Sequence, residues 1–198
     1  MKKLSFLILL LSAVNLYSQN IKSKLDGVKT MEEAQQFVRE NRDLIPEIYT
    51  LSPELDSLPP RYKGISAGDV IKEGSNTIKI ISIGKQSAFR VSYIFLDGSK
   101  KSVGEINKIR NQITNQYKKG IAFTDLAKKY TMDGNATGEL NWFTEGQMVS
   151  EFEKAVREHK KNDLFTIDIP ARKWYYLTLK TFDDMEVTKI TVLKVKGH

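Results

Sequence analysis

The order of hydrophobic patterns after residue 89 constrains the fold more than any other feature of this sequence. Some segments alternate apolar and polar residues, as strands do, and others repeat apolar residues every three or four positions, as helices do. In chain order they form a strand, two helices, a short strand, a helix and two strands, at 89–96, 102–120, 122–130, 140–143, 150–156, 164–169 and 174–182. This order predicts an α+β fold with a small, mainly antiparallel sheet surrounded by three to four helices.

Three helix starts carry the same signature, a hydroxyl residue followed three positions later by glutamate. In such a capping box the hydroxyl and the carboxylate each accept a hydrogen bond from a free backbone N–H. The pairs are Thr30 with Glu33, Ser102 with Glu105, and Ser150 with Glu153. We therefore expect helices to begin at these three places.

The first 18 residues have the layout of a secretory signal peptide. Lys2 and Lys3 precede an apolar run from Leu4 to Val14, and small or polar residues follow. A membrane anchor is the alternative, but the run is shorter than the roughly 20 residues that span a bilayer. We expect cleavage after Ser18 and a mature protein that is periplasmic or secreted, without a stable membrane anchor.

Residues 19–75 differ from the rest of the chain. A short amphipathic helix at 30–42 is followed by an irregular stretch, 44–69, that holds four of the five prolines. We expect an N-terminal helix and a proline-rich arm here. A strand at 76–83 and, after Gly-Lys-Gln-Ser, a second strand at 89–96 then open a second domain, 76–198, with its core at 89–181.

The composition excludes several classes of function. The chain has no cysteine, so it has neither disulfides nor thiolate chemistry. Its net charge of +7 comes from scattered lysines, which are typical of a solvated surface rather than of a nucleic-acid site. The two histidines, His159 and His198, are expected to be solvated. No motif for a metal, a cofactor or a nucleophilic triad is present, so we expect none of these.

The stretch GELNWFTEGQMVSEFEKA, residues 138–155, concentrates large apolar side chains around two glycine turns. Core packing is one explanation, and a pocket for an apolar ligand is the other. Motifs on both sides of this stretch bear on the choice. YKKGIAFTDLAKKYTMD precedes it, and WYYLTLKT follows it.

In this order and at these spacings, the motifs from about 89 to 181 resemble the parvulin (PpiC, rotamase) type of peptidyl-prolyl cis-trans isomerase. The 138–155 stretch is similar to that family's Gly-x-Leu-Gly-Trp-Phe, Gly-x-Met and Phe-Glu-x-Ala series. The resemblance covers about half of the chain. It implies an exported bacterial isomerase with a parvulin-like domain.

The resemblance also implies an apolar pocket for the proline ring of a substrate. The matching positions are Leu140, Met148 and Phe152, with Trp142 and Phe143 supporting the pocket from the core side. For Leu140, core packing remains an alternative.

Three further positions are implied to be catalytic. Asp133 stands where the family has a cysteine or an aspartate near the rotating carbonyl, although it could equally be a turn residue before Gly134. Tyr93 and Tyr176 stand where the family usually has two facing histidines. Their hydroxyls can donate and accept hydrogen bonds, but both could also be ordinary core aromatics.

Two functions follow from these residues. The first is a prolyl isomerase that assists the folding of exported proteins, and its partners are proline-containing peptides and unfolded exported chains. The second is a chaperone or peptide-binding module in which the pocket survives and catalysis is weak or lost. The loss of the histidine pair favours the second, whereas Asp133 with the three apolar positions favours the first.

Overall fold

The computed structural model describes residues 21–197, which divide into two compact units. The first unit contains the described residues up to Lys85 and those from Val187 onward, and the second contains Gln86–Glu186. The domain boundary expected at residue 76 differs from these limits because two strands each contribute to both units. The expected signal peptide at 1–18 lies outside the described residues.

The first unit contains helix α2 (Met31–Glu40) and strands β1 (Glu47–Leu51) and β2 (Val70–Glu73). A further helix is described over residues 21–26, and short 3-10 helices lie at Arg42–Leu44 and Pro60–Tyr62. The predicted helix at 30–42 and its capping box at Thr30 are confirmed.

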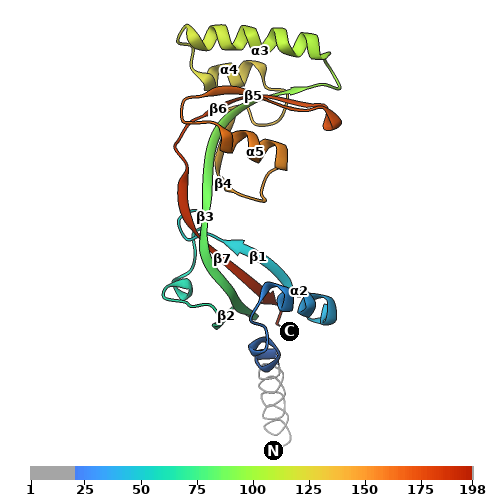
Figure 1. Ribbon diagram of the computed structural model, residues 1–198, viewed down its shortest axis with the longest axis vertical. Coiled ribbons are helices and arrows are strands. Elements are labelled where there is room, and N and C mark those ends of the chain that lie inside the picture. Colours follow the sequence, from blue (N-terminus) through green and yellow to red (C-terminus); the bar gives the residue numbers. More distant parts are fainter. Residues whose placement is uncertain (1–20, 198) are drawn as a thin grey trace, which may run out of the picture. The chain divides into compact units, whose positions relative to one another are not determined.

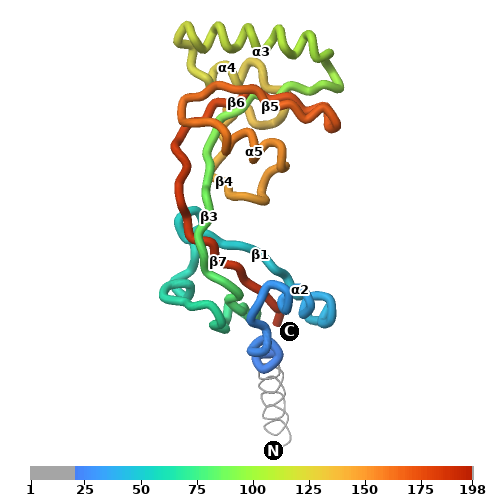
Figure 2. Tube along the Cα trace, in the orientation of Figure 1, coloured from blue at the N-terminus to red at the C-terminus, as the bar shows by residue number. Residues whose placement is uncertain are grey.

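The predicted irregular arm contains a strand, β1, that local sequence did not reveal. It pairs antiparallel with β7 (Met185–Val195), a partner that is distant in the sequence, so the cyan and red traces run side by side in Figure 2. Tyr49 lies opposite Val192 in this ladder. The strand therefore depends on long-range pairing, which an analysis of neighbouring residues cannot detect.

Strand β3 (Asn76–Asp97) is continuous, so the predicted division into two strands, 76–83 and 89–96, is wrong. Gly84 is not among the glycines with positive φ, and the chain stays extended through an exposed stretch. The first part of β3 pairs with β2 and its last part pairs with β6, both antiparallel. The two ends of β3 therefore pair with different strands, β2 and β6, while the chain between them stays extended.

The second unit has a four-stranded arrangement in the order β4-β3-β6-β5. The strands are β4 (Glu139–Thr144), the last part of β3, β6 (Trp174–Lys180) and β5 (Leu164–Ile169), and each neighbouring pair is antiparallel. Helices α3 (Val103–Lys118) and α4 (Phe123–Tyr130) lie on one side of these strands and α5 (Ser150–Glu158) on the other (Figure 1). The predicted α+β fold is confirmed.

Two hydrophobic cores form on the two sides of this sheet because successive strand residues point to opposite faces. The core beneath α3 and α4 contains Ile94, Leu96, Ile106, Ile113, Phe123, Leu126, Ala127, Tyr175, Leu177 and Leu179. The core beneath α5 contains Phe89, Val91, Phe143, Phe152, Val156, Phe165, Ile167 and Ile169.

Of the two capping boxes predicted in the second unit, one is confirmed and the other is wrong. Ser102 and Glu105 cap α3 as expected. The capping box predicted at Ser150 is wrong: Val149 precedes α5 and provides no side-chain cap. Glu153 instead accepts hydrogen bonds from the backbone N–H groups of Gly146 and Met148, both at 2.8 Å. The carboxylate therefore bonds to the loop before the helix rather than to the helix end.

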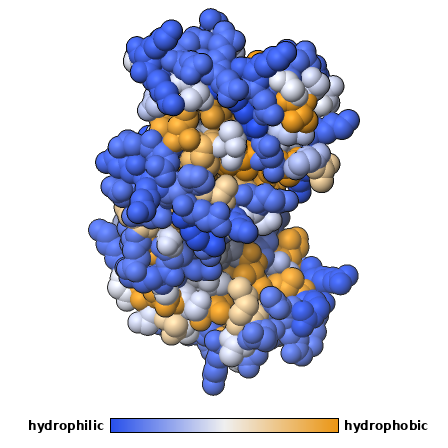
Figure 3. Space-filling view, turned by 45° about the horizontal axis from the view of Figure 1, so that its top comes forward, coloured by the Kyte–Doolittle hydropathy of each residue, from blue (hydrophilic) through white to orange (hydrophobic). Residues whose placement is uncertain are grey.

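The surface agrees with the sequence expectation of a solvated exterior. Hydrophilic residues cover most of the face shown in Figure 3, and hydrophobic residues show in small groups between them. Within residues 21–197, no helix has the length and apolar character needed to cross a bilayer.

Candidate functional site

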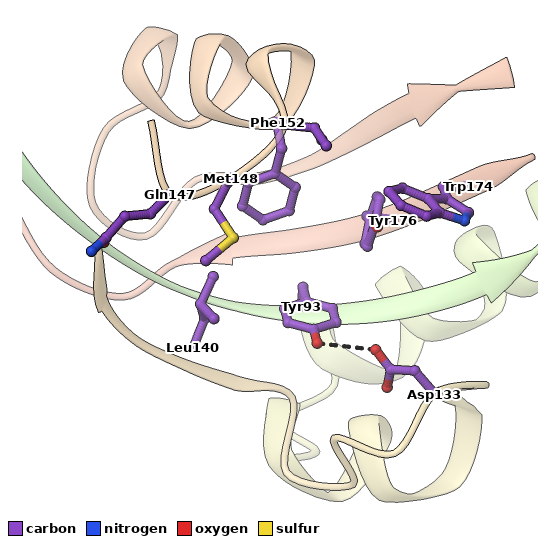
Figure 4. Close-up of a pocket in the computed structure, with 9 residues that line it drawn as sticks. Tyr93, Asp133, Leu140, Gln147, Met148, Phe152, Trp174 and Tyr176 are labelled. Atoms are coloured by element: carbon purple, nitrogen blue, oxygen red, sulfur yellow. Dashed lines mark hydrogen bonds between the residues drawn. The ribbon is translucent and has the colours of Figure 1, made fainter. Parts of the chain in front are cut away.

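A cavity of about 250 Å³ lies on the α5 side of the sheet in the second unit (Figure 4). Asp133 and Gln147 are both exposed, so the cavity is open to solvent rather than sealed in the core. The residues that line it are Tyr93, Asp133, Leu140, Gln147, Met148, Val149, Phe152, Trp174 and Tyr176. All six candidate site residues from the sequence are therefore brought together at one place.

The apolar wall comes from three neighbouring segments. Leu140 belongs to β4, Met148 to the loop before α5, and Phe152 to the first turn of α5, and their side chains converge in Figure 4. Phe152 is buried, whereas Leu140 and Met148 are half-buried. Packing against the core beneath α5 holds all three, and the partial exposure of two of them leaves apolar surface facing the cavity.

The floor of the cavity is aromatic. Tyr93 on β3 and Tyr176 on β6 place their ring centroids 5.7 Å apart at 78°, and Phe152 meets the Tyr176 ring at 5.4 Å and 79°. Such edge-to-face contacts stabilise aromatic pairs beyond simple burial. Both tyrosines therefore pack as aromatics and line the cavity, so the two interpretations from the sequence are compatible.

Asp133 lies at the polar end of the cavity, next to Tyr93. The Tyr93 hydroxyl donates to Asp133 Oδ2 at 3.0 Å (Figure 4). The other oxygen, Oδ1, accepts from the Thr131 hydroxyl at 2.9 Å and the Asn135 N–H at 3.1 Å. Asp133 is therefore a turn residue, as one interpretation held, and also a residue of the cavity.

The loop that carries Asp133 is bound to strand β3 through the backbone. Met132 N–H donates to the Phe95 carbonyl at 2.9 Å, and Tyr93 N–H donates to the Gly138 carbonyl at 2.7 Å. Gly138 has a φ of 69°, and a Cβ at this position would collide with the Tyr93 carbonyl oxygen. The chain therefore requires glycine here to bring the loop close to β3.

Burial changes the acidity of both tyrosines. It raises the pKa of Tyr176 to about 12, and the negative charges of a Tyr93 phenolate and of Asp133 add to this effect. Burial also raises the pKa of Tyr93, as does its hydrogen bond to Asp133. Both hydroxyls are therefore protonated at neutral pH and can act as hydrogen-bond donors.

Three residues of the cavity were not among the sequence candidates. Gln147 and Val149 flank Met148 in the Gly-Gln-Met-Val motif, and Trp174 shares its strand face with Tyr176 because the two are two residues apart. The Arg172 guanidinium lies 4.9 Å from the Trp174 ring. Because side chains alternate between the two faces of β6, the position of Trp174 two residues before Tyr176 could have predicted it as a cavity residue.

The expected supporting role of Trp142 is wrong, whereas that of Phe143 is confirmed. Phe143 packs on Phe152 with ring centroids 6.1 Å apart, but Trp142 contacts Phe182 at 5.7 Å. The β3–β4 register shifts between Phe89 and Val91, so Leu140 and Phe143 share a face and Trp142 points away from it.

The expectation of a solvated His159 is also wrong. Its ring stacks on Phe165 with centroids 3.7 Å apart, and its Nδ1 lies 2.7 Å from the Ala155 carbonyl oxygen. The helix ends at Glu158, which turns the histidine back against the sheet. His198 lies outside the described residues. Within the described chain, no group of three or more His, Cys, Asp or Glu side chains could hold a metal ion.

A comparison with protein families matches a region that contains every lining residue of this cavity except Trp174 and Tyr176. The model of the PPIC-type PPIASE domain matches residues 76–172. The foldase protein PrsA of Bacillus subtilis is 33% identical over 129 residues, which are 61% of this chain and 41% of that protein. The chaperone SurA of Cupriavidus metallidurans is 38% identical over 58 residues, which are 28% of this chain and 11% of that protein.

The chain thus spans less than half the length of these curated relatives. Among solved structures, it is similar to a PpiC-type peptidyl-prolyl cis-trans isomerase domain with 20% identity and a TM-score of 0.45. That similarity covers 57% of this chain and 95% of the other.

Proposed function

Given that residues 76–172 belong to the PpiC-type (parvulin) family of peptidyl-prolyl isomerases, we propose that this protein catalyses cis-trans isomerisation of Xaa-Pro bonds in other polypeptides. One observation carries the proposal. Leu140, Met148 and Phe152 form an open apolar wall beside the hydrogen-bonded pair of Tyr93 and Asp133. A proline ring fits the first part, and the polar amide next to it faces the second.

The reaction needs no bond cleavage. An Xaa-Pro bond prefers trans by only about 0.5–1 kcal/mol, but amide resonance raises the barrier to rotation to roughly 18–20 kcal/mol. A pocket that holds the ring and excludes water favours the twisted amide over the planar one. Within the cavity, the apolar wall performs this holding step.

Polar groups lower the barrier further by compensating the charge that rotation localises. In the twisted amide the nitrogen lone pair is no longer shared with the carbonyl, so a nearby donor stabilises it. Tyr176 is protonated at neutral pH and supplies such a donor. The Tyr93 hydroxyl gives its one proton to Asp133, which orients it, so Tyr93 presents its oxygen as an acceptor to the substrate. We assign the catalytic role to these three residues and substrate binding to Leu140, Met148 and Phe152.

The second candidate function is a chaperone or peptide-binding module with weak or no catalysis. The tyrosines at the positions of the family's histidine pair favour it, because a phenol with a raised pKa exchanges protons less readily than imidazole. The curated relatives include proteins named as a foldase and as chaperones, and both names agree with binding of unfolded polypeptides.

A protease-coupled isomerisation assay on a proline-containing peptide separates the two functions. For the isomerase, the wild type exceeds the uncatalysed rate and Asp133→Ala lowers kcat/KM by about tenfold, since removal of an interaction made only in the transition state slows turnover. No acceleration, together with peptide-dependent NMR shifts of Met148, would establish the binding module instead. Neither acceleration nor binding would refute both.

We propose in addition that the protein is exported and acts on unfolded exported chains. The support is the basic and then apolar layout of residues 1–18. N-terminal sequencing of the protein from a periplasmic or culture fraction tests it. Mature chains that begin after Ser18 are expected, and an intact Met1 in the cytoplasmic fraction would contradict export.

A further inference from the structure

Glu153 is a buried carboxylate at the start of α5, with only 8% of its surface exposed. A buried charge is costly unless hydrogen bonds compensate it. Its Oε1 accepts two such bonds, from Gly146 N–H and Met148 N–H, both at 2.8 Å. Its place in the first turn of α5 adds a favourable interaction with the positive end of the helix dipole.

These two bonds determine the shape of the loop that carries Met148. Gly146 has a φ of 88°, which turns the chain sharply, and the Thr144 N–H donates to the Gln147 side chain at 2.8 Å. Met148 is the only residue of the apolar wall outside a helix or strand. Its backbone is therefore fixed by Glu153 rather than by regular secondary structure.

A second buried charge, Lys180, holds the other end of α5. It is 1% exposed and donates from Nζ to the carbonyls of Val156 at 2.9 Å and His159 at 2.7 Å. It also pairs with Asp184 at 2.6 Å. None of these partners lines the cavity. Each end of α5 is thus held by one buried charge, a carboxylate at the start and an ammonium from β6 at the end, and of the two only Glu153 forms a hydrogen bond with a cavity residue.

We propose that Glu153 is a positioning residue that holds Met148 against the proline ring of the substrate. This inference rests on the proposed function, because it assigns to Glu153 the preorganisation of the binding wall. The carboxylate acts through the loop and does not touch the substrate. A positioned wall avoids the ordering cost that a flexible loop would incur on binding.

Three variants test this role: Glu153→Ala, Glu153→Gln and, as a matched control, Lys180→Met. Peptide affinity is measured at a temperature at which circular dichroism shows each variant folded, and the Met148 methyl signal is followed by NMR without peptide. Glu153→Ala is expected to weaken peptide binding on the order of tenfold, since small misplacements of a site are costly. It should also shift the Met148 methyl signal.

The two other variants separate positioning from stability. Glu153→Gln keeps an oxygen that accepts both N–H groups, so affinity and the Met148 signal should stay near those of the wild type. Lys180→Met should lower Tm yet leave peptide affinity within about twofold, since it leaves the cavity lining intact. If Glu153→Ala does not fold, Glu153→Asp replaces it: the charge stays, but the shorter side chain no longer reaches the loop, and weaker binding is expected.

Two results would overturn the proposal. One is a peptide affinity equal to that of the wild type in Glu153→Ala, or in Glu153→Asp where that variant replaces it. The other is a loss of affinity in Lys180→Met as large as the loss in the Glu153 variant. A wild type that neither binds nor isomerises any proline peptide would refute the proposed function, and the positioning role in binding would fail with it. The methyl signal measured without peptide would still show separately whether Glu153 fixes Met148.

Discussion

The two faces of the sheet in the second unit are built from the same strands and differ in almost everything else. Facing α3 and α4, the side chains of Ile94 and Leu177 are buried and aliphatic. One position earlier on each strand, Tyr93 and Tyr176 are aromatic and only half-buried. The first face is a closed core, whereas the second contains the open cavity.

The length of the covering helices explains the difference. Helices α3 and α4, which cover the first face, are 16 and 8 residues long, whereas α5, which covers the second, is 9 residues long. A short helix leaves part of a strand pair uncovered, and aromatic rings with polar tips tolerate that exposure better than aliphatic chains do. The cavity therefore lies where cover is missing, which makes one face a source of stability and the other a binding site.

The largest effect on stability and on peptide binding is expected from Phe152→Ala, because Phe152 belongs both to the core beneath α5 and to the cavity wall. The ring is 5% exposed and contacts Phe143 and both cavity tyrosines. Its removal should lower the free energy of unfolding by about 4 kcal/mol, as buried Phe→Ala changes do. Chemical denaturation measures this loss, and peptide binding should be abolished at a temperature at which the variant is folded. Retained affinity would contradict the assignment of Phe152 to the wall.

The matching change on the first face is Ile113→Ala. Ile113 on α3 is fully buried, and its truncation should cost about 3 kcal/mol of unfolding free energy. Peptide affinity, measured by titration well below the Tm, should not change, because no residue of this core lines the cavity. A parallel loss of affinity would show that the two faces are coupled rather than independent.

Met148→Ala should affect binding more than stability, which sharpens the contrast. Met148 is half-buried, so truncation should cost about 1 kcal/mol of unfolding free energy, less than a fully buried methionine would. Peptide affinity should fall by about tenfold, equivalent to 1.4 kcal/mol. Calorimetric titration checks the affinity and denaturation the stability. Unchanged affinity would count against the pocket whichever function is correct.

The smallest effect concerns pH. Burial raises the pKa of Tyr176 from 10.0 to about 12, so the folded protein retains a proton that the unfolded chain releases near pH 10. The associated stability is complete below pH 10 and is lost as the pH rises toward 12. Denaturation between pH 8 and 11 should show a decline in the upper part of this range. Tyr176→Phe should reduce it, and an identical decline in that variant would point to another group.

Much of the fold followed from local patterns. The helices at 31–40 and 103–118 begin at the capping boxes expected for them, and β5 and β6 form where alternation predicted strands. These features depend on residues a few positions apart, which the sequence displays directly. The six candidate site residues were chosen by motif, and the structure places all of them around one cavity.

Three of the exceptions share one cause, a partner distant in the chain. The continuous strand β3 and the strand β1 depend on pairing across the sequence. The register shift between Phe89 and Val91 turns Trp142 away from the cavity although Phe143 faces the core. Such pairing has no signature in a window of neighbouring residues.

The sequence by itself determined the order of helices and strands from residue 89 to residue 182, and the motif series of the family. Only the tertiary structure decided that α5 leaves the aromatic face partly uncovered, and that Glu153 bonds to the Met148 loop instead of capping its own helix. The physical reason is that local preferences select secondary structure within a few residues. Cavities and buried charges, by contrast, depend on what the rest of the chain places around them.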